Sequence, residues 1–288
     1  MENPSSAQLA LTGIYPPTPL QRPSDLKTAI ENKKEALKDG SDEDSYLSFS
    51  GVTPERFQYI ESHRDSLEAT RVRFTYFADI ETLIVKVPSE PHEGSHLGIA
   101  NEIRDILRMN SRVSRAEVWA IGSTRYRGNS SSKESDSGYR NNNLRPQAGA
   151  WPHWVIEAGM TESLERLHTD ASWWINNSNG EVRLVILAWI RPRQRFIKIE
   201  FETWSWPICG TWRFGSADTL GGWARHEFHN DVEMDFSVAN QPRYQGPATI
   251  VLPFRRLVGR PPNPPHERDV VLTQQVLLEL GREMLHGL

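Results

Sequence analysis

The 288-residue chain is poor in cysteine, with Cys209 as the single example, and it has no excess of positive charge. Its 33 Lys and Arg stand against 37 Asp and Glu, which gives a formal net charge of −4. A lone cysteine excludes an intramolecular disulfide, so we expect a reducing compartment. The negative balance excludes a protein that coats nucleic acid or membrane by bulk charge, although it leaves room for a local basic groove.

Long apolar runs are also missing. No window approaches the roughly 20 apolar residues that a membrane-spanning helix needs. The N-terminus has no basic stretch followed by an apolar run, so no secretory signal peptide is predicted. We therefore expect an intracellular protein, cytoplasmic or nuclear, that does not associate with a membrane.

Aromatic residues are scarce in residues 1–50, which are rich in Pro, Ser, Asp, Glu and Lys. Such a composition buries too little apolar surface to offset chain entropy, so this segment is predicted to be mostly disordered. Order is expected from Gly51, in a single domain over residues 51–288. Its core would span about 91–204, and residues 205–288 would form a C-terminal extension.

Hydrophobic periodicity predicts an alternation of helices and strands. The expected helices cover residues 53–67, 92–109, 161–176 and 270–285. The expected strands cover residues 71–77, 82–87, 113–121, 133–139, 151–158, 182–190, 196–202 and 248–253, and the first two are expected to form a hairpin. The order predicts an α/β fold with a central mixed sheet, a helix on each face, and a C-terminal β-rich extension with a closing helix.

One acid stands at the start of a predicted helix. Leu97, Ala100, Ile103 and Leu107 lie on one helical face, and the same stripe extended one turn backward reaches Glu93. A carboxylate on a core-facing stripe is unusual, because burying it unpaired is costly. Glu93 is therefore a candidate site residue; the alternative is an ordinary acid that interacts with the helix dipole.

Two further acids lie on neighbouring strands. Asp136 is on a short polar strand and Glu157 ends an apolar one, so the loop between them can bring both carboxylates to one point. Two such carboxylates suit Mg²⁺ or Mn²⁺, which would activate a bound water and neutralise charge on a phosphodiester. The alternative is a pair of strand-end carboxylates held by backbone amides or arginines.

This order of elements resembles the PD-(D/E)XK, or restriction-endonuclease-like, nuclease superfamily. Residues 91–270 are more narrowly similar to a large group of fungal proteins of unknown function that have this core. The matching segments are residues 91–93, 121–125, 132–137, 155–159, 162–164, 170–174, 180–183, 252–254 and 260–262. The resemblance implies a metal-dependent nuclease in which Asp136 and Glu157 hold the ion and Glu93 assists beside them.

The superfamily's lysine is absent from its usual place. It would stand two residues after the Glu157 position, where this chain has Gly159. Lys133 and Lys198 are the candidate replacements. In a regular strand, residues three apart face opposite sides, so Lys133 needs a twist or a bulge to reach the same point as Asp136. The alternative interpretation of Lys133 is a solvated lysine in a loop.

Arginines near the predicted site favour a nucleic-acid partner. Arg125, Arg127 and Arg140 flank it, and their forked donors suit phosphate groups, although they can equally be solvated charges. Nucleases of this class often act in pairs, so a homodimer is one state that the resemblance allows. The alternatives to a nuclease are an inactive nuclease-derived binding or interaction module, which Gly159 favours, and a hydrolase of small phosphate esters.

A His-x-x-His pattern occurs in the extension, where His226 and His229 flank Glu227 and precede Asp231. It lacks the second half of a zinc site and shows no helical periodicity, so no zinc site is expected there. The tryptophans nearby are expected to pack in the β-rich extension.

Overall fold

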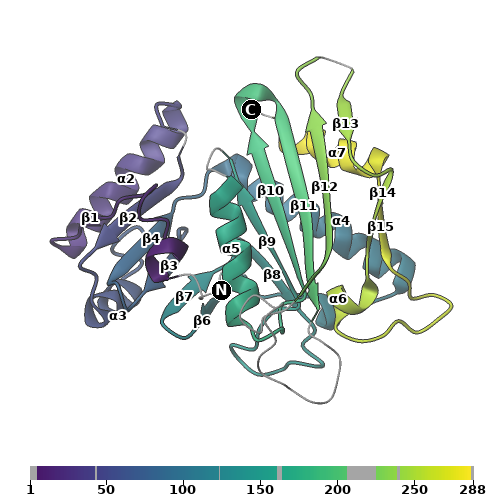
Figure 1. Ribbon diagram of the computed structural model, residues 1–288, viewed down its shortest axis with the longest axis horizontal. Helices are drawn as coiled ribbons and strands as arrows, with labels where there is room; N and C mark the ends of the chain where they lie inside the picture. Colours follow the sequence, from purple (N-terminus) through teal and green to yellow (C-terminus); the bar gives the residue numbers. More distant parts are fainter. Residues whose placement is uncertain are drawn as a thin grey trace.

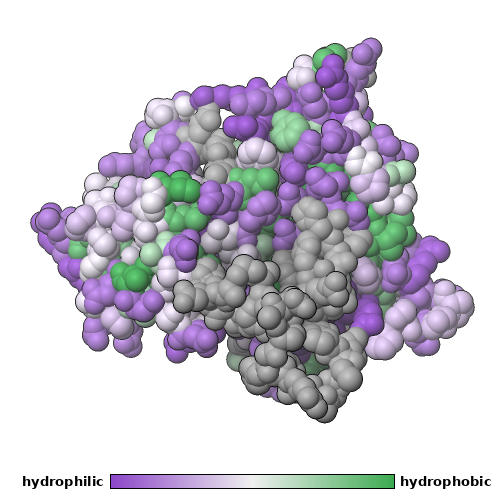
Figure 2. All heavy atoms as spheres, in the orientation of Figure 1, coloured by the Kyte–Doolittle hydropathy of each residue, from purple (hydrophilic) through white to green (hydrophobic). Residues whose placement is uncertain are grey.

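The computed structural model describes residues 5–42, 44–122, 124–160, 164–205, 225–238 and 241–286. Within these ranges the chain forms a six-stranded sheet, a seven-stranded sheet and a two-stranded ribbon (Figure 1). Cys209 lies outside the described residues. No helix of the described part is long and apolar enough to cross a bilayer. The face shown in Figure 2 is mostly hydrophilic, with small and separate apolar patches.

The seven-stranded sheet is the central mixed sheet that the sequence predicts. Its order is β13-β12-β11-β10-β9-β8-β5, and only the β9–β10 pair in it is parallel. These strands are β5 (Trp119–Ala120), β8 (Ser137–Arg140), β9 (Trp154–Gly159), β10 (Leu184–Arg191), β11 (Phe196–Ser205), β12 (Arg225–Asp235) and β13 (Arg243–Gln245). A short 3₁₀ turn (Pro192–Gln194) links β10 to its antiparallel partner β11. The predicted α/β class is confirmed.

A helix covers each face of this sheet. α4 (Glu90–Ser111) packs on one face, and α5 (Leu164–Asn177) packs on the other, where it stands in front of β9 and β10 in Figure 1. Strand alternation divides β9 between them: Ile156 joins the core on the α4 side, and Val155 joins the core on the α5 side. The same alternation directs Glu157 toward α5.

The six-stranded sheet has the order β1-β2-β4-β3-β7-β6. Its strands are β1 (Thr18–Pro19), β2 (Tyr46–Ser50), β3 (Arg73–Phe77), β4 (Thr82–Lys86), β6 (Arg125–Arg127) and β7 (Ser131–Glu134). α2 (Pro23–Asp39) and α3 (Pro54–Ser62) share one hydrophobic core with it, at the purple end of the molecule in Figure 1. Thr53 caps α3 through its hydroxyl, and β3 and β4 form the predicted hairpin.

The first fifty residues are more ordered than their composition predicts. Residues 5–42 and 44–50 form α1 (Ser6–Leu9), β1, α2 and β2. Leu26 and Ile30, four residues apart on α2, are fully buried, and Phe49 of β2 joins the same core. A few apolar side chains at helical and strand spacing are enough when the other strands of the same sheet supply the opposing surface.

Two predicted strands differ from the structure. The middle of residues 113–121 is a 3₁₀ turn (Arg115–Val118), because Ser114 and Glu117 form a capping box there. The strand that follows, β5, is only Trp119–Ala120. The predicted strand over residues 133–139 is divided at Ser135 and Asp136, where the chain passes from β7 in one sheet to β8 in the other.

The C-terminal region closes the α4 face of the mixed sheet. β14 (Thr249–Leu252) and β15 (Val270–Thr273) form the ribbon, and α6 (Phe254–Val258) lies between them in sequence. The closing helix α7 (Gln274–Met284) begins later than predicted, because residues 270–273 pair with β14. Thr273 then caps it by accepting a hydrogen bond from the Val276 N–H at 3.3 Å.

Candidate functional site

A cluster of six buried charged side chains lies where the two sheets meet. Its members come from β4, β7, the β7–β8 turn, β9 and α5, and each is at most 4% exposed. They are Lys86, Lys133, Asp136, Glu157, Arg166 and Asp170. We refer to them as the junction cluster. Burying ion pairs costs much of what their attraction returns, so such a cluster is weak evidence for stability and a good candidate for function.

The two oxygens of Asp136 have different environments. Oδ2 accepts hydrogen bonds from Lys86 Nζ at 2.7 Å and from the Ala158 N–H at 2.9 Å, and His92 Nε2 lies 3.2 Å from it. Oδ1 is buried, and no hydrogen-bond partner for it lies in the described part of the chain. Burial favours the neutral acid, but the Lys86 ammonium and His92 outweigh it and hold the pKa of Asp136 well below its usual range.

Glu157 has the opposite electrostatic balance. Its Oε1 accepts a hydrogen bond from Trp174 Nε1 at 2.5 Å and lies 3.6 Å from Lys133 Nζ. Burial raises the pKa of Glu157 to about 8 despite the opposing Lys133 charge, and the carboxylates of Asp136 and Asp170 act in the same direction as burial. With the protein's own groups alone, burial therefore shifts Glu157 toward its neutral form.

Lys133 reaches the cluster because the chain changes sheets after it. Its ammonium lies 3.0 Å from Asp170 Oδ1, which also accepts from Arg166 at 2.5 Å. Burial acts to raise the pKa of Asp170, but the charges of Arg166 and Lys133 outweigh it and lower that pKa. Lys198 lies elsewhere, on β11, where Glu200 is its nearest acidic partner at 3.2 Å.

Glu93 lies beside the junction cluster in the first turn of α4. Its Oε1 accepts from Arg73 at 3.1 Å, and its Oε2 is 3.4 Å from His96 Nε2. Burial opposes ionisation, but the favourable contact with His96 and the Arg73 charge prevail, so the pKa of Glu93 is lowered. His92 connects the two regions, since it contacts Asp136 and precedes Glu93.

The three predicted phosphate-binding arginines are not equivalent. Arg125 is paired with Glu134 at 2.7 Å and is only partly exposed. Arg140 donates to the backbone of the loop over residues 142–150 and so holds that loop in place. Arg127 is exposed on β6, and its guanidinium makes no hydrogen bond or ion pair with the described residues.

Sequence reasoning missed Lys86, His92 and His96. Lys86 lies in the predicted strand over residues 82–87, but its partner Asp136 is fifty residues away along the chain. The two histidines carried a clearer signal. They are four residues apart at the start of a predicted helix, which places both imidazoles on one face beside Glu93.

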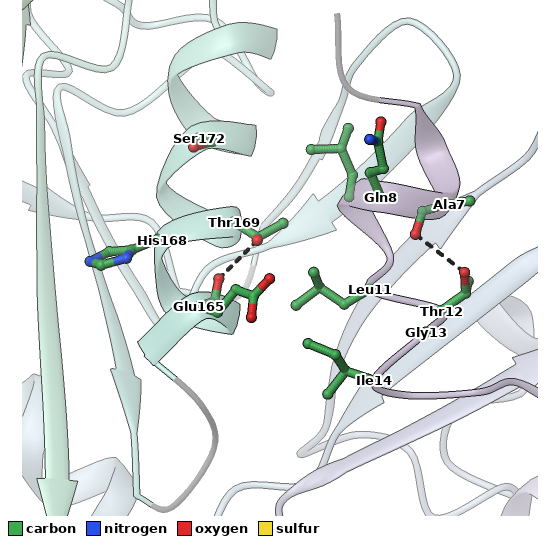
Figure 3. A pocket seen from close by; sticks show the side chains of 11 residues that line it. Ala7, Gln8, Leu11, Thr12, Gly13, Ile14, Glu165, His168, Thr169 and Ser172 are labelled. Carbon is green, nitrogen blue, oxygen red and sulfur yellow. Dashed lines mark hydrogen bonds between the residues drawn. The ribbon is translucent and has the colours of Figure 1, made fainter.

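Two features lie apart from the junction cluster. The side chains of His226, Glu227 and His229 are outside the described residues. A pocket of about 600 Å³ lies between α1 and α5, and Leu11, Ile14, Glu165 and Thr169 are among its lining residues (Figure 3). No member of the junction cluster lines it.

No protein-family model matches the chain, and no curated protein resembles it significantly in sequence. Among solved structures, it is similar to the crystal structure of a candidate nuclease of the DUF820 group from Anabaena variabilis ATCC 29413. That match has 10% sequence identity and a TM-score of 0.40, and it covers 72% of this chain and 90% of the other.

Proposed function

We propose that the junction cluster is the active site of a metal-dependent phosphodiesterase that acts on nucleic acid. In this proposal Asp136 and Glu157 bind Mg²⁺ or Mn²⁺, Glu93 assists beside them, and Lys133 replaces the lysine that Gly159 cannot supply. The observation that carries it is the Lys133 ammonium, 3.6 Å from Glu157 Oε1 in a buried site. The resemblance of residues 91–270 to the PD-(D/E)XK superfamily gives the reaction class.

The donor groups fit a hard divalent cation. Asp136 Oδ1 is a buried oxygen that lacks a hydrogen-bond partner in the described chain, and the raised pKa of Glu157 marks a carboxyl group that is short of positive charge. A bound cation would correct both, since hard ions prefer carboxylate oxygens. When bound, the ion would lower the pKa of a coordinated water and neutralise charge on the phosphodiester.

The protein's own groups would position this chemistry. Lys86 and the Ala158 N–H fix one oxygen of Asp136, and the Trp174 indole fixes Glu157. Lys133 would place a positive charge beside the negative charge that develops on the phosphate. Such a fixed charge acts strongly in a site shielded from water, because it needs no reorganisation during the reaction.

A second candidate function is a binding module that does not cut. The enclosure of the site favours it, because all six side chains of the junction cluster are buried. Tyr46 of β2 adds to this cover, since its hydroxyl donates a hydrogen bond to Asp170 at 3.4 Å. A nuclease requires this cover to open so that a phosphate can reach the carboxylates. A binding module that uses another surface can function while the junction cluster stays covered.

Cleavage assays separate the two functions. The full chain is incubated with Mg²⁺ or Mn²⁺ and labelled single- and double-stranded DNA and RNA. We expect Asp136→Asn, Glu157→Gln and Lys133→Met each to lower the rate by about 100-fold or more, because each removes a preorganised charge. Lys198→Met is the matched control, a sheet lysine paired with acids away from the site, and it should keep the wild-type rate.

Unchanged cleavage by Asp136→Asn would refute the assignment of the active site. Nucleic-acid binding without cleavage, under either metal and with every substrate, would favour the binding module.

A further inference from the structure

The start of α4 brings together three metal-ligating side chains that the proposed active site does not fully use. One ring nitrogen from each of His92 and His96 and a carboxylate oxygen of Glu93 lie within 4.8 Å of one another. Both imidazoles are nearly fully buried, whereas the Glu93 side chain is 38% exposed. The group is therefore rigidly held but open to solvent on one side.

Each histidine has one ring nitrogen in use. His92 Nε2 lies 2.9 Å from the Ala158 carbonyl oxygen and 3.2 Å from Asp136 Oδ2. Since both neighbours are acceptors, this nitrogen carries the proton. His96 Nδ1 makes its bond to Ser137 Oγ at 2.8 Å. Such outer contacts to carbonyl, carboxylate and hydroxyl groups are typical of histidines that bind a metal through the other nitrogen.

The other ring nitrogen of each histidine is left over. His92 Nδ1 and His96 Nε2 are buried, and the described part of the chain offers neither a hydrogen-bond partner. A buried nitrogen without a partner costs free energy. His96 Nε2 also lies 3.4 Å from a Glu93 oxygen, and a lone pair that faces a carboxylate requires a cation between them, either a proton or a metal ion.

We propose that His92, Glu93 and His96 bind a divalent transition-metal ion of the zinc class. Two imidazoles and one carboxylate select such an ion over Mg²⁺, which prefers oxygen ligands. Three protein ligands leave the fourth tetrahedral position for water or a substrate. The ligands of this site do not include Asp136 or Glu157, although His92 contacts Asp136 and Glu93 also belongs to the proposed active site. The assignment does not depend on whether the chain cleaves nucleic acid.

The other group of this kind, His168 with Glu200 and Glu202, is less suited. Its histidine is 45% exposed, and His168 Nε2 is already bonded to Glu200 at 2.5 Å. It serves as an internal control for the assignment.

Metal titration of the full chain tests the proposal. The protein is freed of metal with a chelator, dialysed, and titrated with ZnCl₂ by calorimetry and with CoCl₂ by visible absorption. We expect one equivalent of each ion to bind, and the Co²⁺ spectrum to show tetrahedral or five-coordinate geometry. His92→Ala and His96→Ala should weaken binding by about 100-fold or more, which exceeds the loss typical of outer-shell partners.

Control variants make the result decisive. His168→Ala and Glu157→Gln should bind Zn²⁺ like the wild type, and the second of these still reports separately on cleavage. Because the histidines are buried, Glu93→Gln provides a variant at a partly exposed ligand, and circular dichroism confirms that each variant is folded. The proposal is overturned if the folded wild type binds no Zn²⁺, if folded Glu93→Gln and His96→Ala bind it as tightly as the wild type, or if His168→Ala abolishes binding.

Discussion

Glu134 and Asp136 stand two residues apart, are equally buried at 4% exposure, and have very different surroundings. Glu134 has both oxygens satisfied: Oε1 accepts from Arg64 at 2.6 Å and from Arg125 at 2.7 Å, and Oε2 accepts from the Phe74 N–H at 3.1 Å. Asp136 concentrates its contacts on Oδ2 and leaves Oδ1 without a hydrogen bond in the described structure.

The contrast shows that burial alone does not identify a functional carboxylate. Arginine forks and a backbone amide satisfy Glu134, so this residue of β7 links β3, β6 and the turn after α3 as a structural centre. Asp136 is held by a lysine and an amide on one side, and its open oxygen carries an uncompensated cost. A ligand can remove that cost, whereas no ligand improves Glu134.

The largest expected effect is on stability at Glu134. In Glu134→Ala, Arg64 and Arg125 lose their shared partner while keeping Glu61, so the free energy of unfolding should fall by about 3 kcal/mol, the lower end for a broken buried pair. Urea unfolding measures it, and Glu68→Ala at an exposed position is the control. A loss below about 1 kcal/mol would mean that the arginine pairs are weak surface pairs.

The next largest effect is the stabilisation by Mg²⁺, which should depend on Asp136 and not on Glu134. If Asp136 binds the ion in the folded state, Mg²⁺ at a hundred times its dissociation constant stabilises the wild type by about 2.7 kcal/mol. Thermal unfolding with and without Mg²⁺ should show this gain in Glu134→Gln and not in Asp136→Asn. A gain of equal size in both variants would place the ion away from Asp136.

The strongly periodic parts of the fold could be predicted from sequence. The helix expected over residues 92–109 is α4, and the β3–β4 hairpin follows an equally clear pattern. The division between β7 and β8 was not predicted. Residues 135–138 are of types that are common in turns, but they do not show that the two halves of the run join different sheets. The change of sheet is decided by pairing with β3 on one side and β9 on the other.

The candidate site was predictable only in part. Asp136 and Glu157 were expected at one point, and both lie in the junction cluster. Lys86 and Arg166 were not expected there, because their places depend on contacts between segments distant in the chain. Arg166 donates to the carbonyl of Leu9 at 3.2 Å, in a segment whose composition predicts disorder.

His153 is another buried ionisable group, which belongs neither to the junction cluster nor to the group at the start of α4. It should make a smaller, pH-dependent contribution to stability. Burial lowers the pKa of His153 to about 3, and its Nδ1 accepts a hydrogen bond from the Asn141 N–H at 3.3 Å. Below the ordinary pKa of about 6.5, the unfolded chain binds a proton that the folded chain refuses. Stability is therefore fully present above that value and is lost as the pH falls toward 3.

His153→Gln should remove this dependence. Between about pH 6 and pH 4, which lie between the unfolded and folded pKa values of His153, the wild-type free energy of unfolding should fall more steeply than that of the variant. The difference in slope should be at most about 1.4 kcal/mol per pH unit. Urea unfolding at several pH values measures both slopes. Parallel slopes would show that His153 is protonated in the folded protein.

The smallest expected effect concerns Arg125 and Arg127, which repeat on β6 the contrast between Glu134 and Asp136. Arg127 is exposed and uncommitted among the described residues, so a nucleic acid can use it; Arg125 is committed to Glu134. Arg127→Ala should weaken nucleic-acid binding modestly and lower the slope of log affinity against log salt by about 1, without changing stability. Arg125→Ala should lower stability instead, because it leaves Glu134 one donor short. Binding titrations over a range of salt concentrations measure the slope, and an unchanged slope in Arg127→Ala would move the phosphate-binding surface away from β6.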